Sequence, residues 1–186
     1  MFPSGSTVAT VVYGQGGSFI SGTANLGGVS ARSLSAPFGV AVDSAGGVYT
    51  VDEGNNRVLY FPNGTTTATR VYGQPAEAVS ALESRAASQL ATFSPVSSWY
   101  AARFTTSPTN LGGVSSSSLL APRGVSLGSN GLFYISDTGN NRVLAFAQGS
   151  TYATAVYGQS SNFATNQVNM GSVSYTHLTL PTKRIV

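Results

Sequence analysis

The sequence predicts an all-β fold built from a repeated four-stranded unit. Residues 19–74 align without a gap to residues 104–159 at a constant offset of 85, and 32 of these 56 positions are identical. Each copy contains short stretches of β-branched, aromatic or alternating apolar residues, and turns rich in Gly and Asn separate them. A fixed repeat combined with short strands and tight turns is typical of an array of antiparallel sheets.

Within the first copy, four stretches have strand character: Phe38–Asp43, Val48–Asp52, Arg57–Phe61 and Ala68–Gly73. The first alternates apolar residues with period two, and the second and third are β-branched and aromatic. The turns between them read SAGG, EGNN and PNGTTT, which are typical of antiparallel hairpins. Four antiparallel strands repeated about an axis form the blade of a β-propeller.

The repeat also sets the expected domain boundaries. Residues 1–171 are expected to be one partial propeller, with blade copies at about 36–74 and 121–159 and partial copies at 1–15 and 160–171. The motif VYGQ ends each of the first three copies. Met1 aligns with a position inside the third strand of a blade, so we expect the chain to be an incomplete fragment of a longer array.

A different composition marks residues 75–103 as an insertion between the blades. This stretch is rich in Ala and contains Trp99, the only tryptophan. Val79, Leu82 and Leu90 would share one side of an amphipathic helix. A helical decoration, a partner-binding loop and an assembly or splice error all remain open as interpretations.

Residues 172–186 form a tail that the repeat does not explain. Back-translation of Ser172–Thr182 resembles sequencing-adapter DNA, so we expect a non-native tail, with a natural Thr/Leu-rich segment as the alternative. The tail contains His177 and Lys183, the only histidine and the only lysine. The sequence pI of about 9.4 is therefore largely an effect of this end and does not indicate nucleic-acid binding.

The segment APFGVAVDSAGGVYTVDEGNNRVLYF resembles a blade of the NHL-repeat family of β-propellers. The resemblance covers nearly all of 36–74 and 121–159, and it implies an all-β propeller of NHL-type blades. One residue and one triplet depart from the family pattern. Gly128 stands where the first copy has Asp43, and Asn56-Arg57-Val58 replaces the Asn-His-Leu triplet.

One charged motif recurs in each blade copy. Asp52 and Arg57 flank Glu-Gly-Asn-Asn in the first copy, and Asp137 and Arg142 flank Thr-Gly-Asn-Asn in the second. Metal ligation by the two aspartates is one interpretation. The favoured one is a structural turn, in which the carboxylate accepts amide hydrogen bonds and the arginine closes a charge-assisted bond to it.

We expect no catalytic, cofactor-binding or metal-ligating residue in these blades. The chain has no Cys, and residues 1–171 have no His, which excludes thiolate and histidine chemistry there. Asp43 would need several further oxygen donors to bind calcium. GQGGSF at 14–19 lacks the Lys-Ser/Thr of a phosphate loop. The arginines are not clustered in the sequence, so the chain shows no run of basic residues of the kind that favours nucleic-acid binding.

These observations favour a non-catalytic propeller scaffold that binds a protein or a small ligand of unknown identity. The alternative is a fragment of a propeller hydrolase or lyase whose active-site residues lie in missing blades. The apolar runs are too short for a transmembrane helix. Incomplete arrays leave blade faces open, so self-association is expected. A sequon at Asn63-Gly64-Thr65 slightly favours an extracellular location, which the sequence otherwise leaves unknown.

Overall fold

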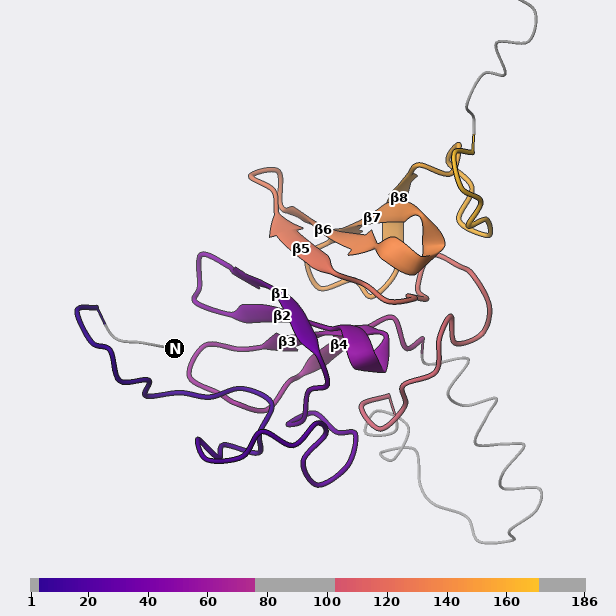
Figure 1. Ribbon diagram of the computed structural model, residues 1–186. Helices are drawn as coiled ribbons and strands as arrows, with labels where there is room; N and C mark the ends of the chain where they lie inside the picture. The colour runs from indigo at the N-terminus through magenta and orange to yellow at the C-terminus, as the bar shows by residue number, and fades with distance from the viewer. Residues whose placement is uncertain (1–3, 76–102, 171–186) are drawn as a thin grey trace, which may run out of the picture.

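The computed structural model describes residues 4–75 and 103–170, which form two four-stranded antiparallel sheets side by side (Figure 1). The first sheet contains β1 (Pro37–Val42), β2 (Val48–Asp52), β3 (Arg57–Phe61) and β4 (Arg70–Tyr72). The second contains β5 (Gly124–Leu127), β6 (Leu132–Asp137), β7 (Arg142–Ala147) and β8 (Ala153–Tyr157). The strands of each sheet follow chain order, and the two sheets do not close into a ring.

The predicted all-β class and the four-stranded blades are thus confirmed. Strands β2 and β3 have the predicted bounds, whereas β4 is shorter than the predicted Ala68–Gly73. The Ala68 amide donates to the carbonyl of Ala31 instead of joining the ladder. Gly73 has φ of +95°, which ends the extended conformation.

Single-turn 3₁₀ helices lie between the second and third strands of each blade, as η1 (Glu53–Asn55) and η2 (Thr138–Asn140). Across residues 4–75 and 103–170, no helix is both long enough and apolar enough to cross a membrane. The insertion 75–103, for which the sequence leaves three interpretations open, and the predicted non-native tail 172–186 lie outside the described residues, apart from positions 75 and 103.

Alternation along the strands gives each sheet two apolar faces. We call the face of the first sheet that contains Val48, Leu59 and Phe61 its leading face, because the preceding segment of the chain covers it. The opposite, trailing face contains Tyr49 and Tyr72 and packs on the second sheet. In the second sheet the offset of 85 places Phe133, Leu144 and Phe146 on the leading face, and Tyr134 and Tyr157 on the trailing face.

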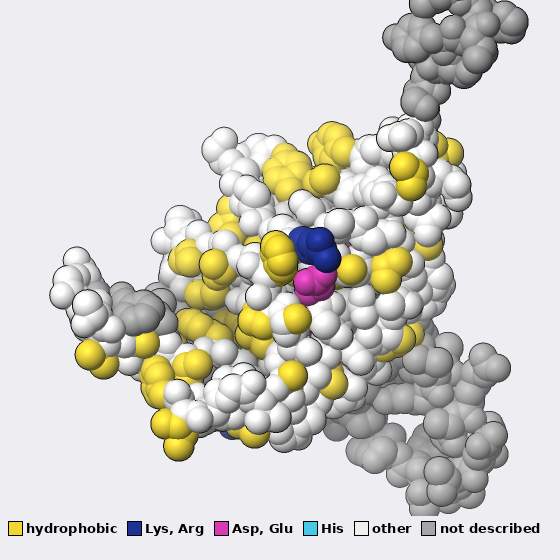
Figure 2. All heavy atoms as spheres, in the orientation of Figure 1, with side chains coloured by type: hydrophobic (Ala, Val, Ile, Leu, Met, Phe, Trp, Pro, Cys, Tyr) yellow, Lys and Arg dark blue, Asp and Glu magenta, His cyan; other side chains and the backbone are white. Residues whose placement is uncertain are grey.

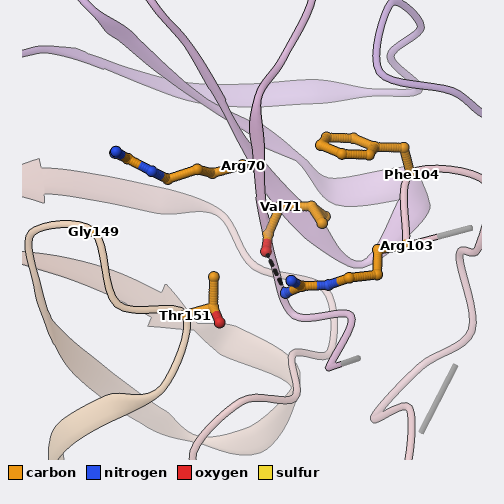
Figure 3. Close-up of a pocket in the computed structure, with 6 residues that line it drawn as sticks. All are labelled: Arg70, Val71, Arg103, Phe104, Gly149 and Thr151. Atoms are coloured by element: carbon orange, nitrogen blue, oxygen red, sulfur yellow. Dashed lines mark hydrogen bonds between the residues drawn. The ribbon is translucent and has the colours of Figure 1, made fainter. Parts of the chain in front are cut away.

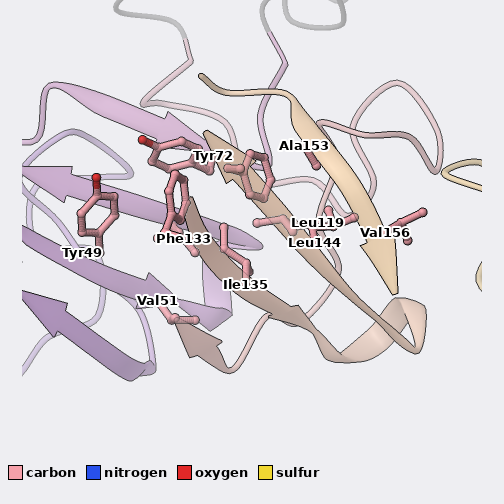
Figure 4. Packing of buried hydrophobic residues seen from close by; sticks show 11 residues of the cluster. Tyr49, Val51, Tyr72, Leu119, Phe133, Ile135, Leu144, Ala153 and Val156 are labelled. Carbon is pink, nitrogen blue, oxygen red and sulfur yellow. The ribbon is translucent and has the colours of Figure 1, made fainter. Parts of the chain in front are cut away.

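The core between the two sheets is mostly aromatic and aliphatic (Figure 4). Tyr72 meets Phe133 and Phe146 edge to face, with ring centroids 4.9 and 5.6 Å apart, and Tyr49 lies 5.1 Å from Phe133. These side chains have almost no solvent exposure. Burial of rings of this size supplies much of the apolar contact that joins the two blades.

The N-terminal segment packs on the first sheet as β4 packs on the second. Tyr13 meets Phe61 edge to face with ring centroids 5.0 Å apart, which matches the pair of Tyr72 and Phe146. Gly14 passes against Leu34, and Gly73 passes against Leu119 in the same manner. The same type of contact therefore occurs twice in the described chain, once between the two sheets and once between the segment around Tyr13 and the first sheet.

Candidate functional site

The recurring charged motif lies where the second strand of each blade turns into the third. Asp52 ends β2, Arg57 begins β3, and Asn56 between them has φ of +53° in the left-handed region. Both Asp52 oxygens are occupied. Oδ2 accepts the Arg57 Nε–H at 2.7 Å, and Oδ1 accepts the backbone amide of Ser35 at 2.7 Å. Asn55 donates to both oxygens as well.

Arg57 is completely buried, and its guanidinium holds three chain segments together. Besides Asp52, it donates through Nη1 to the carbonyl of Phe104 and through Nη2 to the carbonyls of Ser30 and Ser33, at 2.9 and 3.1 Å. Burial lowers the pKa of Arg57 from its ordinary value, and the Asp52 carboxylate opposes that shift. The side chain therefore carries a compensated charge and serves as an internal crosslink.

The second blade reproduces this arrangement around Asp137 and Arg142. Their Nε–Oδ2 distance is again 2.7 Å, the Leu120 amide donates to Asp137 Oδ1 at 2.7 Å, and Asn140 donates to Oδ2. Arg142 donates to the carbonyls of Phe163, Ser115 and Ser118. Burial raises the pKa of Asp137, and the hydrogen bonds from Leu120, Asn140 and Arg142 oppose that shift.

Two asparagines outside the predicted motif complete it, and sequence reasoning did not single them out. Asn25 and Asn55 exchange a pair of amide hydrogen bonds at 3.0 and 2.8 Å, and Asn110 and Asn140 do so at 2.9 and 2.7 Å. Their identity in both NLGGVS runs is the sequence signal that points to them. Each connector that begins there is thus tied directly to the charged turn of its own blade.

A second recurring set links each blade to the next segment of chain. The Asn56 carboxamide donates to the carbonyl of Ser107 and accepts the Ala121 amide, at 3.0 and 2.9 Å. Gln74 Nε2 donates to the carbonyls of Asn56 and Pro108. Gln159 takes the same place in the second blade, with bonds to Asn141 and Gln167. The final Gln of VYGQ therefore links the turn of its own blade to the next segment of the chain by hydrogen bonds.

Asp43 forms part of a turn in the structure. Its Oδ1 accepts the amides of Ala45 and Gly47 at 3.0 and 2.7 Å, as is usual for an aspartate in a turn. The ring of Tyr60 lies beside it, and burial together with the Asp43 charge raises the pKa of Tyr60. Gly128 stands at the matching position in the second blade, so this carboxylate belongs to one blade alone.

A pocket of about 230 Å³ lies where the two sheets meet, and two arginines contribute to its lining (Figure 3). Arg103 donates to the carbonyls of Gln74 and Val71, at 3.1 and 3.3 Å. Figure 3 shows the Arg70 side chain directed away from Arg103, and its guanidinium lies over the Tyr60 ring at 4.9 Å. The two arginines therefore line one pocket without converging on a common point in it.

Across the described ranges 4–75 and 103–170, no group of three or more His, Cys, Asp or Glu side chains is arranged to hold a metal ion. The buried carboxylates of Asp52 and Asp137 instead accept hydrogen bonds on both oxygens from groups within the chain. The arrangement can position backbone segments, and the carboxylates of Asp52 and Asp137 are already engaged.

The NHL repeat family matches residues 119–146 of this chain. The matched span begins at Leu119 in the inter-sheet core and covers β5, β6, η2 and most of β7. It contains both members of the Asp137 and Arg142 pair. No curated protein matches the chain. The chain therefore contains an NHL repeat at residues 119–146, which builds the first three strands of its second blade.

Proposed function

We propose that this chain is a non-catalytic interaction module, and that its connectors at residues 25–35 and 110–120 form the binding surface. The observation that carries the proposal is the anchoring of both connectors by the buried charged turns. Arg57 binds the carbonyls of Ser30 and Ser33, and Arg142 binds those of Ser115 and Ser118.

Anchoring of this kind prepares a loop for binding. A loop held in one conformation loses little entropy when a partner binds, so more of the contact energy contributes to affinity. Binding residues commonly lie on loops that a rigid scaffold positions. Here the same bonds hold both connectors at corresponding edges of successive blades. The repetition supports a surface that extends over more than one blade.

The buried aspartates fit a structural role better than a catalytic one. Each of Asp52 and Asp137 accepts an arginine, an asparagine and a backbone amide, and the same set occurs in both blades. A hydrogen-bonded turn that recurs in both blades, and whose carboxylate oxygens are all engaged, favours a role in stabilising the blade. We therefore assign Asp52, Arg57, Asp137 and Arg142 to the framework that presents the connectors.

The test is to select peptides from a phage-displayed random library on the immobilised chain. Selected peptides should lose at least about tenfold in affinity for the Leu26→Glu variant, because Leu26 is an exposed apolar residue of the first connector. Val168→Glu, at an exposed position outside both connectors, should leave binding unchanged. Peptides insensitive to Leu26→Glu, or turnover of ester and lactone substrates by the chain, would contradict the proposal.

A further inference from the structure

The two outer faces of this pair of blades are complementary halves of the contact that joins the blades internally. We propose that copies of this chain associate head to tail, with the trailing face of the second sheet of one copy docking on the leading face of the first sheet of the next. The inference is independent of the connector surface, because it concerns the sheet faces.

The open part of the leading face lies along β1. Val40 pairs with Thr50 and Val42 pairs with Val48, which places both valines on the leading face. Their side chains are 67% and 57% exposed. Val125 and Leu127, the residues 85 positions later, are packed against the inter-sheet core. Among residues 4–75 and 103–170, no sheet packs over these two valines. Exposed hydrophobic side chains gather over this region in Figure 2.

The open part of the trailing face contains Tyr134, Val143 and Tyr157. Tyr157 is 52% exposed, whereas its counterpart Tyr72 is completely buried against the second sheet. The rings of Tyr134 and Tyr157 lie 6.4 Å apart and present an aromatic surface of the type that Tyr49 and Tyr72 form in the internal contact. The two described sheets therefore present one half of the contact on each outer face.

A hydrogen bond at the edge of the contact between the two blades supports the same register for the docking of a second copy. Asn56 Oδ1 accepts the amide of Ala121 at 2.9 Å, across the boundary between the blades. The counterpart of Asn56 is Asn141, which is exposed, and the counterpart of Ala121 is Ala36, which is exposed as well. Ala36 and Ala121 share an unusual positive φ, +47° and +43°. Docking of a second copy brings the Asn141 carboxamide to the amide of Ala36.

A second copy is the occupant that these features specify. The internal contact joins two units that are identical at 32 of 56 aligned positions, and the two described sheets present both of its halves on opposite outer faces. The two surfaces differ from each other, so the contact is heterologous. Repetition of a heterologous contact produces a ring if the rotation closes and a filament if it does not.

Docking in this register requires the incoming copy to displace Tyr13 from the leading face. Tyr13 now packs on Phe61, at the position where Tyr157 of the incoming copy would pack. The N-terminal segment and the incoming blade therefore compete for the outer part of the leading face. Tyr13→Ser should strengthen association several-fold by weakening the competitor. Weaker association of this variant would contradict the proposed competition between the N-terminal segment and the incoming blade.

The main test is sedimentation velocity over a wide range of protein concentrations. The unmodified chain should form concentration-dependent oligomers. Val40→Glu and Tyr157→Glu should each weaken association at least about tenfold, because each buries an unpaired carboxylate in the contact. The matched controls are Val8→Glu and Tyr152→Glu, at a 70% exposed valine and a 42% exposed tyrosine outside the two faces. Both controls should associate like the unmodified chain.

Mixing the two impaired variants gives the decisive result. Val40→Glu retains an intact trailing face and Tyr157→Glu retains an intact leading face, so the mixture should form a 1:1 dimer that grows no further. Circular dichroism of each variant verifies that the sheets remain folded. A chain that stays monomeric at every concentration, or a mixture that stays monomeric, would overturn the proposal. Either result would mean that another segment or partner covers these faces.

Discussion

At the scale of single residues, two buried arginines organise the molecule. Arg57 and Arg142 each neutralise an aspartate and bind backbone carbonyls from segments distant in sequence. A buried ion pair adds little net stability compared with apolar residues of the same size. We expect its value here to be specificity, because the planar fork of guanidinium donors binds carbonyls of the connector in a fixed geometry.

Removal of one partner from such a pair should be costly. Arg57→Met leaves the Asp52 carboxylate buried without its cation, and we expect the free energy of unfolding to fall by about 3–5 kcal/mol. Urea denaturation followed by circular dichroism measures this change. The control is Arg123→Met, which removes a pair between Arg123 and Glu53 at a half-exposed site and should cost less than about 1 kcal/mol. Equal losses for the two variants would contradict the assigned role of Arg57.

At the scale of elements, the first strands of the two sheets, β1 and β5, lie in contact with each other. Gly39 lies so close to the second sheet that a Cβ atom there would be 2.8 Å from the carbonyl oxygen of Arg123 and 3.3 Å from Cα of Gly124. Backbone of one blade thus approaches backbone of the next, and neither segment can move aside easily. Glycine is required at this position by proximity, since its φ is not in the left-handed region.

Gly39→Ala should therefore separate β1 from β5. We expect a loss of about 1–3 kcal/mol in the free energy of unfolding, the usual cost of overpacking a close contact. Gly22→Ala is the matched control, because Gly22 has an ordinary φ and no heavy atom within 4 Å of a Cβ built there. Urea titrations of the two variants provide the comparison. A Gly39→Ala variant as stable as the control would show that the sheets can separate at this point without cost.

At the scale of the whole molecule, the described chain is two blades that share one core. The cluster around Tyr49, Tyr72, Phe133 and Phe146 draws its members from both sheets (Figure 4). In repeat arrays each unit depends on its neighbours for burial, so adjacent units unfold together when their interface is strong. The two sheets are expected to behave as one cooperative unit for this reason.

Phe133→Ala tests that expectation, because Phe133 belongs to the second sheet and contacts Tyr49 and Tyr72 of the first. The variant should lose about 3–5 kcal/mol of stability. Hydrogen exchange should show that the amides of β2 and β3 lose protection together with those of β6 and β7. Phe19→Ala, at a 57% exposed ring, should alter neither. Retained protection of β2 and β3 in Phe133→Ala would show that the blades unfold separately.

Much of this architecture could be predicted from the sequence because its signals are local. The alternation in FGVAV, the β-branched VYTVD and the Gly-Asn turns predict strands and hairpins whose geometry depends on neighbouring residues. The left-handed φ of Asn56 and Asn141 follows from the same local chemistry. The offset of 85 then indicates that the second blade repeats the first.

The tertiary structure alone decided which distant groups meet. No spacing in the sequence places Arg57 on the carbonyl of Phe104, pairs Asn25 with Asn55, or leaves Val40 exposed where Val125 is covered. Such contacts depend on how the sheets pack and on which segment covers each face. The blade and its turns therefore follow from local sequence, because short-range hydrogen bonding and side-chain alternation control them. Packing between blades determined the anchored connectors and the two open faces, because burial depends on the neighbours that a residue acquires only after folding.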